Sequence, residues 1–207
     1  MPAKPKAIFF DLGGVLVKFK AAKIYENLSN ALSLSADEVM RLATDSHHAL
    51  SQNFELGLID GKEFYKQVSQ SIDLEIGYDT FKKAYVDIFT ENLYVIRLAK
   101  YLKKYYPLFL LSNTTSWHFE FIRDKFKWMD LFTGLITSYQ VGLLKPDQAI
   151  YQYALKFAQV NPAEALFIDD LLENITAARK IGMYGIHYRD NEDLIKQLKK
   201  LNIKLTQ

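Results

Sequence analysis

The residue best placed to do chemistry in this chain is Asp11, a carboxylate at the end of a short apolar segment. Residues 7–10 are apolar, and Gly13 and Gly14 follow shortly after the acid. A short apolar run bounded by glycines predicts a buried parallel strand. A charged side chain at the end of such a strand is costly to bury unless it has a function. Ligands of open α/β sheets bind at the carboxyl ends of the strands. Asp11 is therefore a candidate nucleophile or metal ligand, with a strand-ending glycine turn as the alternative.

Polar residues also follow the later apolar segments; they are Ser112, Asn113, Lys145, Asp169 and Asp170. Because the carboxyl ends of parallel strands meet at one edge of a sheet, we expect these side chains to converge with Asp11. Three carboxylates together are unfavourable unless a cation binds, and hard oxygen ligands of this kind suit Mg²⁺ shared with a phosphate. Each residue alone is explained by a helix cap or a turn. As a set they predict a site for magnesium and phosphate.

Two kinds of segment must position these residues. Short apolar segments at 108–111, 134–137, 165–168 and 184–188 alternate with helical patterns. This alternation predicts the α/β class, with a doubly wound (Rossmann-like) parallel sheet. From about residue 21 to residue 106 the pattern is helical with almost no strand signal, which predicts an inserted α-helical bundle that caps the sheet edge. We place the α/β core at 1–17 and 104–207, and the helical cap at 18–103.

Within the predicted cap, two sequence patterns mark helix starts. Ser35 with Glu38 and Asp60 with Glu63 have the spacing of a capping box.

Composition limits the classes of function. The chain has 207 residues, a net charge of +2 with scattered lysines, and no cysteine. The absence of cysteine excludes disulfides, thiol catalysis and cysteine-ligated metals, and the small net charge gives no argument for nucleic acid or a membrane surface. No apolar run approaches the ~18 residues of a membrane helix. We expect a cytoplasmic monomer or dimer whose partner is a small molecule.

With these residues in place, the chain resembles the haloacid dehalogenase-like superfamily, in the subfamily with an α-helical cap after the first motif. Four segments carry the resemblance: Phe-Phe-Asp-Leu-Gly-Gly-Val-Leu at 9–16, Leu-Leu-Ser-Asn-Thr at 110–114, Gly-Leu-Leu-Lys-Pro-Asp at 142–147 and Phe-Ile-Asp-Asp-Leu-Leu-Glu-Asn at 167–174. It covers essentially the whole chain. The branch that looks closest contains α-glucose-1-phosphate phosphatase and has a similar cap segment at 54–57.

The resemblance implies a hydrolase, a magnesium-dependent phosphatase that acts through an aspartyl-phosphate. Asp11 would attack phosphorus. Asp11, the backbone carbonyl of Gly13 and Asp170 would hold Mg²⁺. Asp169 would bind the metal through water or orient the other ligands.

The resemblance also implies how the phosphate is bound. Ser112 and the backbone N–H of Asn113 would donate hydrogen bonds to phosphoryl oxygens. The backbone at Leu12 and Gly13 would contribute to the same pocket. Lys145 would pair with the nucleophile and the phosphate.

Gly13 departs from the family pattern, in which most phosphatases carry a second Asp that protonates the leaving group. Such acid–base help is typically worth ~10²–10⁴-fold in rate. Three explanations are open. The leaving group needs little protonation, as for the anomeric hydroxyl of a sugar 1-phosphate; Glu55 in the cap, or a water, supplies the proton; or the protein binds phosphate ligands without turnover.

Two other functions stay open at this level. Metal-independent 2-haloacid dehalogenases use the same Asp and also lack the second one, although the acids at 169 and 170 argue against that activity. A non-catalytic regulatory protein that binds a phosphate ligand is the other. None of the four histidines has metal-ligand spacing, and His118 is the one nearest to the predicted site.

Overall fold

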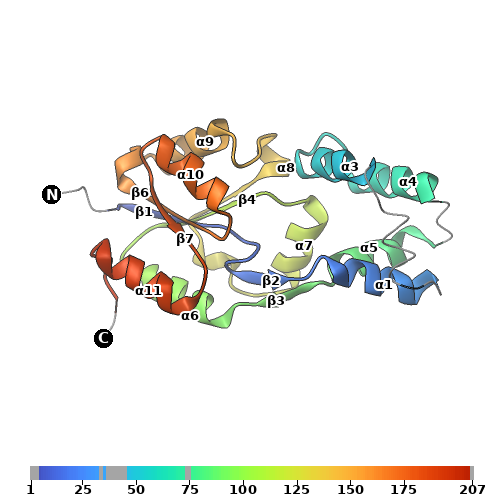
Figure 1. The fold of residues 1–207 in the computed structure, drawn as a ribbon, viewed down its shortest axis with the longest axis horizontal. Helices are drawn as coiled ribbons and strands as arrows, with labels where there is room; N and C mark the ends of the chain where they lie inside the picture. The colour runs from blue at the N-terminus through green and yellow to red at the C-terminus, as the bar shows by residue number, and fades with distance from the viewer. Residues whose placement is uncertain (1–4, 33–34, 36–45, 73–75, 206–207) are drawn as a thin grey trace.

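The computed structural model describes residues 5–32, 35, 46–72 and 76–205 (Figure 1). Its centre is a five-stranded sheet in the order β5-β4-β1-β6-β7, and every neighbouring pair of strands is parallel. The strands are β1 (Ala7–Phe10), β4 (Leu108–Ser112), β5 (Gly134–Thr137), β6 (Ala165–Asp169) and β7 (Tyr184–His187). The predicted parallel α/β sheet is confirmed.

Helices cover both faces of this sheet (Figure 1). One face packs α6 (Leu93–Leu102), α7 (Ser116–Lys125) and α11 (Asn191–Lys200), and the other packs α9 (Gln148–Ala158) and α10 (Leu172–Lys180). Since successive strand side chains point to opposite faces, Phe10 joins the first apolar cluster and Phe9 joins the second. Both faces are therefore buried, which explains why each strand reads as a continuous apolar run.

Three short helical segments complete this part of the chain: η1 (Met129–Leu131), α8 (Ser138–Val141) and η2 (Pro162–Glu164). None of the described helices is both long enough and apolar enough to span a membrane.

The inserted helices that the structure describes form a third apolar cluster beside the sheet edge (Figure 1). They are α1 (Ala22–Leu32), α3 (Ser46–Glu55), α4 (Gly61–Ile72) and α5 (Tyr78–Val86). Trp117, from the start of α7, packs edge-on against Phe54 and Phe64, so a residue of the core helix lies inside the cluster of the cap. The backbone N–H of Glu63 donates to Asp60 at 2.9 Å, as the predicted helix start requires; Glu38 of the other predicted start lies outside the described residues.

A two-stranded antiparallel ribbon joins the core to the inserted helices. It consists of β2 (Val17–Phe19) and β3 (Phe89–Glu91), which the sequence did not predict because each strand has only three residues. The helix that follows, α6, buries Val95, Ala99 and Leu102 in the cluster of the sheet and not in that of the cap. We therefore propose that the insertion ends with β3 at residue 91, where the sequence placed its end at residue 103.

Candidate functional site

The carboxyl ends of β1 and β6 bring three carboxylates together. Asp11 follows β1, and its backbone N–H donates to the carbonyl of Ile168 in β6 at 2.9 Å. Asp169 ends β6, and Asp170 comes next. One oxygen from each of the three carboxyl groups lies within 4.8 Å of the others. The expected convergence of acids at this edge is therefore present.

Lys145 lies between two of these carboxylates. Its buried Nζ is 2.8 Å from Oδ1 of Asp11 and 2.7 Å from Oδ2 of Asp169. The loop that carries this lysine is held by Asn113, whose side chain donates to the carbonyl of Lys145 and accepts from its N–H, both at 2.8 Å. The side chain of Asn113 thus positions Lys145, a contact that the sequence did not reveal.

The surroundings of the two adjacent acids differ. Asp169 is fully buried, and besides Lys145 it accepts hydrogen bonds from the side chain of Asn174 at 3.0 Å and from the N–H of Leu171 at 2.7 Å. Asp170 is half-buried, and its carboxylate lies so close to Gly14 that a Cβ there would be 2.1 Å from Oδ2. Both oxygens of Asp169 accept from donors of the chain, whereas Asp170 borders a cavity of about 910 Å³.

The functional residue that sequence reasoning missed is Asn174. Asn174 is the last residue of the fourth motif segment and lies in the first turn of α10. Its position five residues after Asp169 could have indicated the contact, because the first turn of a helix that follows a strand lies close to the end of that strand.

The electrostatics of the cluster favour a bound cation. Burial raises the pKa of Asp11 to about 7, with Asp169 and Asp170 adding to the rise and Lys145 opposing it. Burial acts to lower the pKa of Lys145, but Asp11 and Asp169 outweigh burial, so the pKa is raised. Burial also raises the pKa of Asp170, and Asp169 adds to this effect. One lysine does not balance three acids, and the all-oxygen donor set is one that Mg²⁺ prefers.

Apart from Lys145, the residues predicted to bind phosphate border one cavity. Ser112 is buried at the end of β4, and it lines a cavity of about 150 Å³ together with Leu12, Gly13 and Asn113. The cap contributes Glu55 to the same cavity. The structure thus brings the phosphate-site candidates and the cap carboxylate to one place.

His118 also borders this cavity, but its ring is engaged elsewhere. It stacks on the ring of Tyr85 with centroids 4.7 Å apart, and its Nε2 is 3.3 Å from the Tyr85 carbonyl oxygen. Burial lowers its pKa to about 4. His118 is therefore a neutral packing residue.

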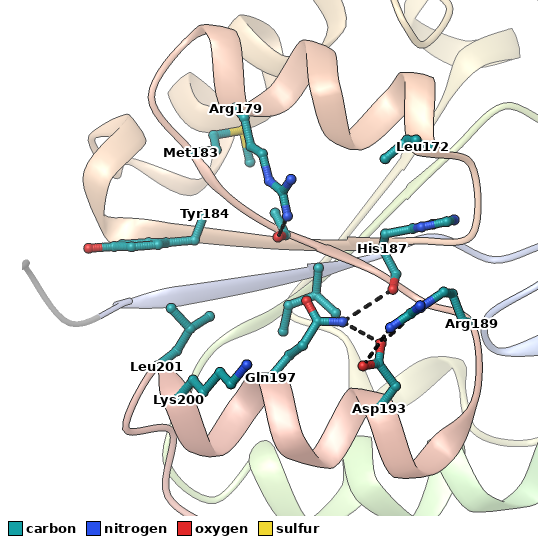
Figure 2. Close-up of a pocket in the computed structure, with 12 residues that line it drawn as sticks. Leu172, Arg179, Met183, Tyr184, His187, Arg189, Asp193, Gln197, Lys200 and Leu201 are labelled. Atoms are coloured by element: carbon teal, nitrogen blue, oxygen red, sulfur yellow. Dashed lines mark hydrogen bonds and ion pairs between the residues drawn. The ribbon is translucent and has the colours of Figure 1, made fainter.

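A larger cavity, of about 620 Å³, lies away from the acids, between α10 and α11 along the edge strand β7 (Figure 2). Arg179 donates to the carbonyl of Gly185 at 2.7 Å, and Gln197 donates to the carbonyl of His187 at 3.4 Å. These side chains cover the outward carbonyls of an edge strand, which protects it from pairing with another chain.

With this geometry in view, comparison with known proteins identifies the family. Residues 5–182 match the haloacid dehalogenase-like hydrolases. The chain belongs to this family. The predicted hydrolase class and the resemblance drawn from the four motif segments are thereby confirmed.

Two curated relatives span nearly the whole of this haloacid dehalogenase-like hydrolase. A sesquiterpene phosphatase from Aspergillus oryzae is 29% identical over 200 residues, which are 95% of this chain and 96% of the relative. A D-ribitol-5-phosphate phosphatase from Bacteroides thetaiotaomicron is 31% identical over 200 residues, 93% of this chain and 96% of the relative. These two relatives, whose lengths are comparable to that of this chain, are both named as phosphatases.

A solved structure shares the fold of the hydrolase. A haloacid dehalogenase family enzyme from Bacteroides thetaiotaomicron, crystallised with magnesium and inorganic phosphate, matches with a TM-score of 0.80 at 23% identity. The match covers 89% of this chain and 94% of that one.

Proposed function

We propose that this hydrolase is a magnesium-dependent phosphatase that hydrolyses a small phosphorylated metabolite through an aspartyl-phosphate. The observation that carries the proposal is the contact of the Lys145 ammonium with Asp11, beside the partly buried Asp170. A buried carboxylate paired with a lysine is suited to attack an anion, because the lysine offsets the repulsion between the two negative charges. The phosphatase relatives support this reaction type.

The reaction proceeds in two displacements. A carboxylate oxygen of Asp11 attacks phosphorus, the bond from phosphorus to the leaving-group oxygen breaks, and that oxygen departs with the electron pair. A water molecule then attacks phosphorus, which releases phosphate and restores the Asp11 carboxylate. Lys145 offsets charge in both displacements, and the Ser112 hydroxyl and the Asn113 N–H donate to the phosphoryl oxygens.

The donor set described above fits magnesium. Asp11, Asp170 and the backbone carbonyl of Gly13 would hold the ion, while Asp169, whose oxygens are engaged by donors of the chain, would orient Lys145 and the neighbouring ligands. Bound Mg²⁺ supplies neutralisation of charge on the nucleophile and the phosphate.

The leaving group is not determined by the family. The curated relatives are named for a sesquiterpene and for a pentitol phosphate, one apolar and one polyhydroxylated. Our prediction of the branch with α-glucose-1-phosphate phosphatase rests on the motif segments and the cap segment at 54–57, and that of a sugar 1-phosphate on Gly13 and the acidity of an anomeric hydroxyl. A phenol meets the same requirement, so residue 13 alone does not distinguish the two.

The first experiment is a screen of phosphorylated metabolites for phosphate release in Mg²⁺, with Asp11→Asn as the blank. We expect release above that blank from the wild-type protein, and its loss on addition of EDTA. No release above the blank from any compound contradicts the proposal and leaves the non-catalytic binding protein. Halide release from a 2-haloacid that persists in EDTA would instead identify a dehalogenase.

A further inference from the structure

The cavity beside the phosphate-site residues has walls of unlike character. Its side next to the strand ends is formed by Leu12, Gly13, Ser112, Asn113 and Thr114. Its outer walls come from the ribbon and from helices α1, α3 and α7. Apart from Glu55 and His118, the residues of these walls are apolar: Phe19, Ala21, Ile24, Ile88, Phe89 and Ile122. A phosphate ester with its phosphoryl group at the strand ends would therefore place its leaving group against apolar side chains.

Several polar side chains that border the cavity are already engaged. Both polar atoms of the Asn113 side chain bond to the backbone of Lys145. The Nε2 of His118 lies within hydrogen-bond distance of the Tyr85 carbonyl, and its ring is covered by that tyrosine. Among the described residues, Glu55 is the one carboxylate that lines the cavity. A polyhydroxylated leaving group would bury hydroxyls with few partners, which is unfavourable.

Phe19 takes the space that a side chain at position 13 would need. A Cβ at Gly13 would lie 3.0 Å from Cε1 of Phe19. The Phe19 ring is 6.0 Å from the ring of Phe89 across the ribbon. It also borders a second cavity of about 910 Å³ that reaches Asp170. An aromatic ring therefore stands over the position where the family pattern has a second Asp.

We propose that the substrates of this enzyme are phosphate monoesters whose leaving group is small and apolar, and that Phe19 determines this specificity. The proposal rests on the phosphatase function above. The size follows from the cavity volume of about 150 Å³, part of which the phosphoryl group takes beside Ser112 and Asn113, so that the space left for the leaving group is small. In the first displacement the leaving oxygen takes the electron pair of the broken P–O bond and then a proton, from Glu55 or from water.

The test compares apolar with polyhydroxylated substrates of similar leaving ability. We compare 3-methylbutyl phosphate with ribitol 5-phosphate, both esters of primary alcohols, and phenyl phosphate with α-glucose 1-phosphate. We expect kcat/KM of the wild-type enzyme to be about 100-fold higher for the apolar member of each pair, the scale of discrimination by a few apolar contacts. Phe19→Ser should lower kcat/KM for the apolar substrates about 10-fold and leave the polyhydroxylated ones unchanged, whereas Phe19→Leu should stay near wild type.

A matched control is Phe157→Ser on α9, because Phe19 and Phe157 are each 49% exposed and Phe157 is remote from the site. Phe157→Ser should leave kcat/KM unchanged for both the apolar and the polyhydroxylated substrates. Thermal unfolding of each variant shows whether it is folded. Two results would contradict the proposed specificity but not the phosphatase function. One is a wild-type kcat/KM for the polyhydroxylated substrates that equals or exceeds that for the apolar ones. The other is an equal loss of kcat/KM for both classes in Phe19→Ser. Failure of every substrate to exceed the Asp11→Asn blank would instead count against the phosphatase function itself.

Discussion

The sheet edge that holds the acids and the adjoining cavity of about 150 Å³ differ in the kind of residue that forms them. At the sheet edge, Asp11, Lys145 and Asp169 are buried and lie in direct contact, fixed by strand ends and by hydrogen bonds from the chain. The outer walls of the cavity come from the ribbon, the inserted helices and α7, and apart from Glu55 and His118 they are apolar. The difference separates reaction type from specificity. The core holds the groups that bind and attack a phosphate, and the insertion shapes the space for the rest of the substrate.

The largest effect is expected at the sheet edge, from Lys145→Met. Removing the ammonium leaves Asp11 and Asp169 buried beside each other, and breaking a buried pair in this way costs about 3–5 kcal/mol of the free energy of unfolding. The rate should also fall about 10²–10³-fold, because charge near the phosphate is no longer offset. Urea unfolding and kcat/KM measure the two losses.

The matched control is Lys125→Met, which breaks an exposed ion pair with Asp87 of similar length, 2.8 Å. Exposed pairs of this kind contribute about 0–1 kcal/mol. Equal destabilisation by the two variants would contradict the distinction between the buried sheet edge and the surface.

A smaller effect is expected in the cavity, from Glu55→Gln. If Glu55 supplies the proton that Gly13 cannot, the variant should lose about 10²-fold in kcat for 3-methylbutyl phosphate. It should lose little for phenyl phosphate, whose phenolate leaves without protonation. Glu120→Gln, at an exposed position of α7, is the control. Unchanged turnover of both substrates at every pH would exclude Glu55 as the acid.

The smallest effect is expected from His118→Phe and concerns stability. The ordinary pKa of histidine is 6.5, and burial lowers that of His118 to about 4. Between these values the unfolded chain binds a proton that the folded chain does not, so the free energy of unfolding falls as the pH falls from 6.5 to 4. The loss between pH 7 and pH 5 should be about 2 kcal/mol. Urea unfolding at both values should show a correspondingly smaller loss in the variant; identical pH dependence in the two proteins would contradict a neutral His118 packed against Tyr85.

The sequence sufficed to predict the sheet and the convergence of the acids because both depend on local patterns. An apolar run followed at once by an acid places Asp11 and Asp169 at strand ends, and parallel strands bring those ends together. The ribbon was missed because Val17–Phe19 and Phe89–Glu91 are short and lie about 70 residues apart. The pairing of Asn113 with Lys145 and the contact of Phe19 with Gly13 were missed because each requires knowing how two separate loops or strands pack.

The most direct test of the central claim is the detection of phosphate on Asp11 itself. Trypsin cleaves after Lys6 and Lys18, and the peptide between them, residues 7–18, contains Asp11 as its one carboxylate side chain. Acid-quenched enzyme taken during turnover of phenyl phosphate in Mg²⁺ should yield this peptide with a mass increase of roughly 80 Da, that of a phosphoryl group in a covalent intermediate. The increase should be absent from Asp11→Asn. Turnover without any modification of that peptide, or modification of a different peptide, would contradict Asp11 as the phosphoryl acceptor.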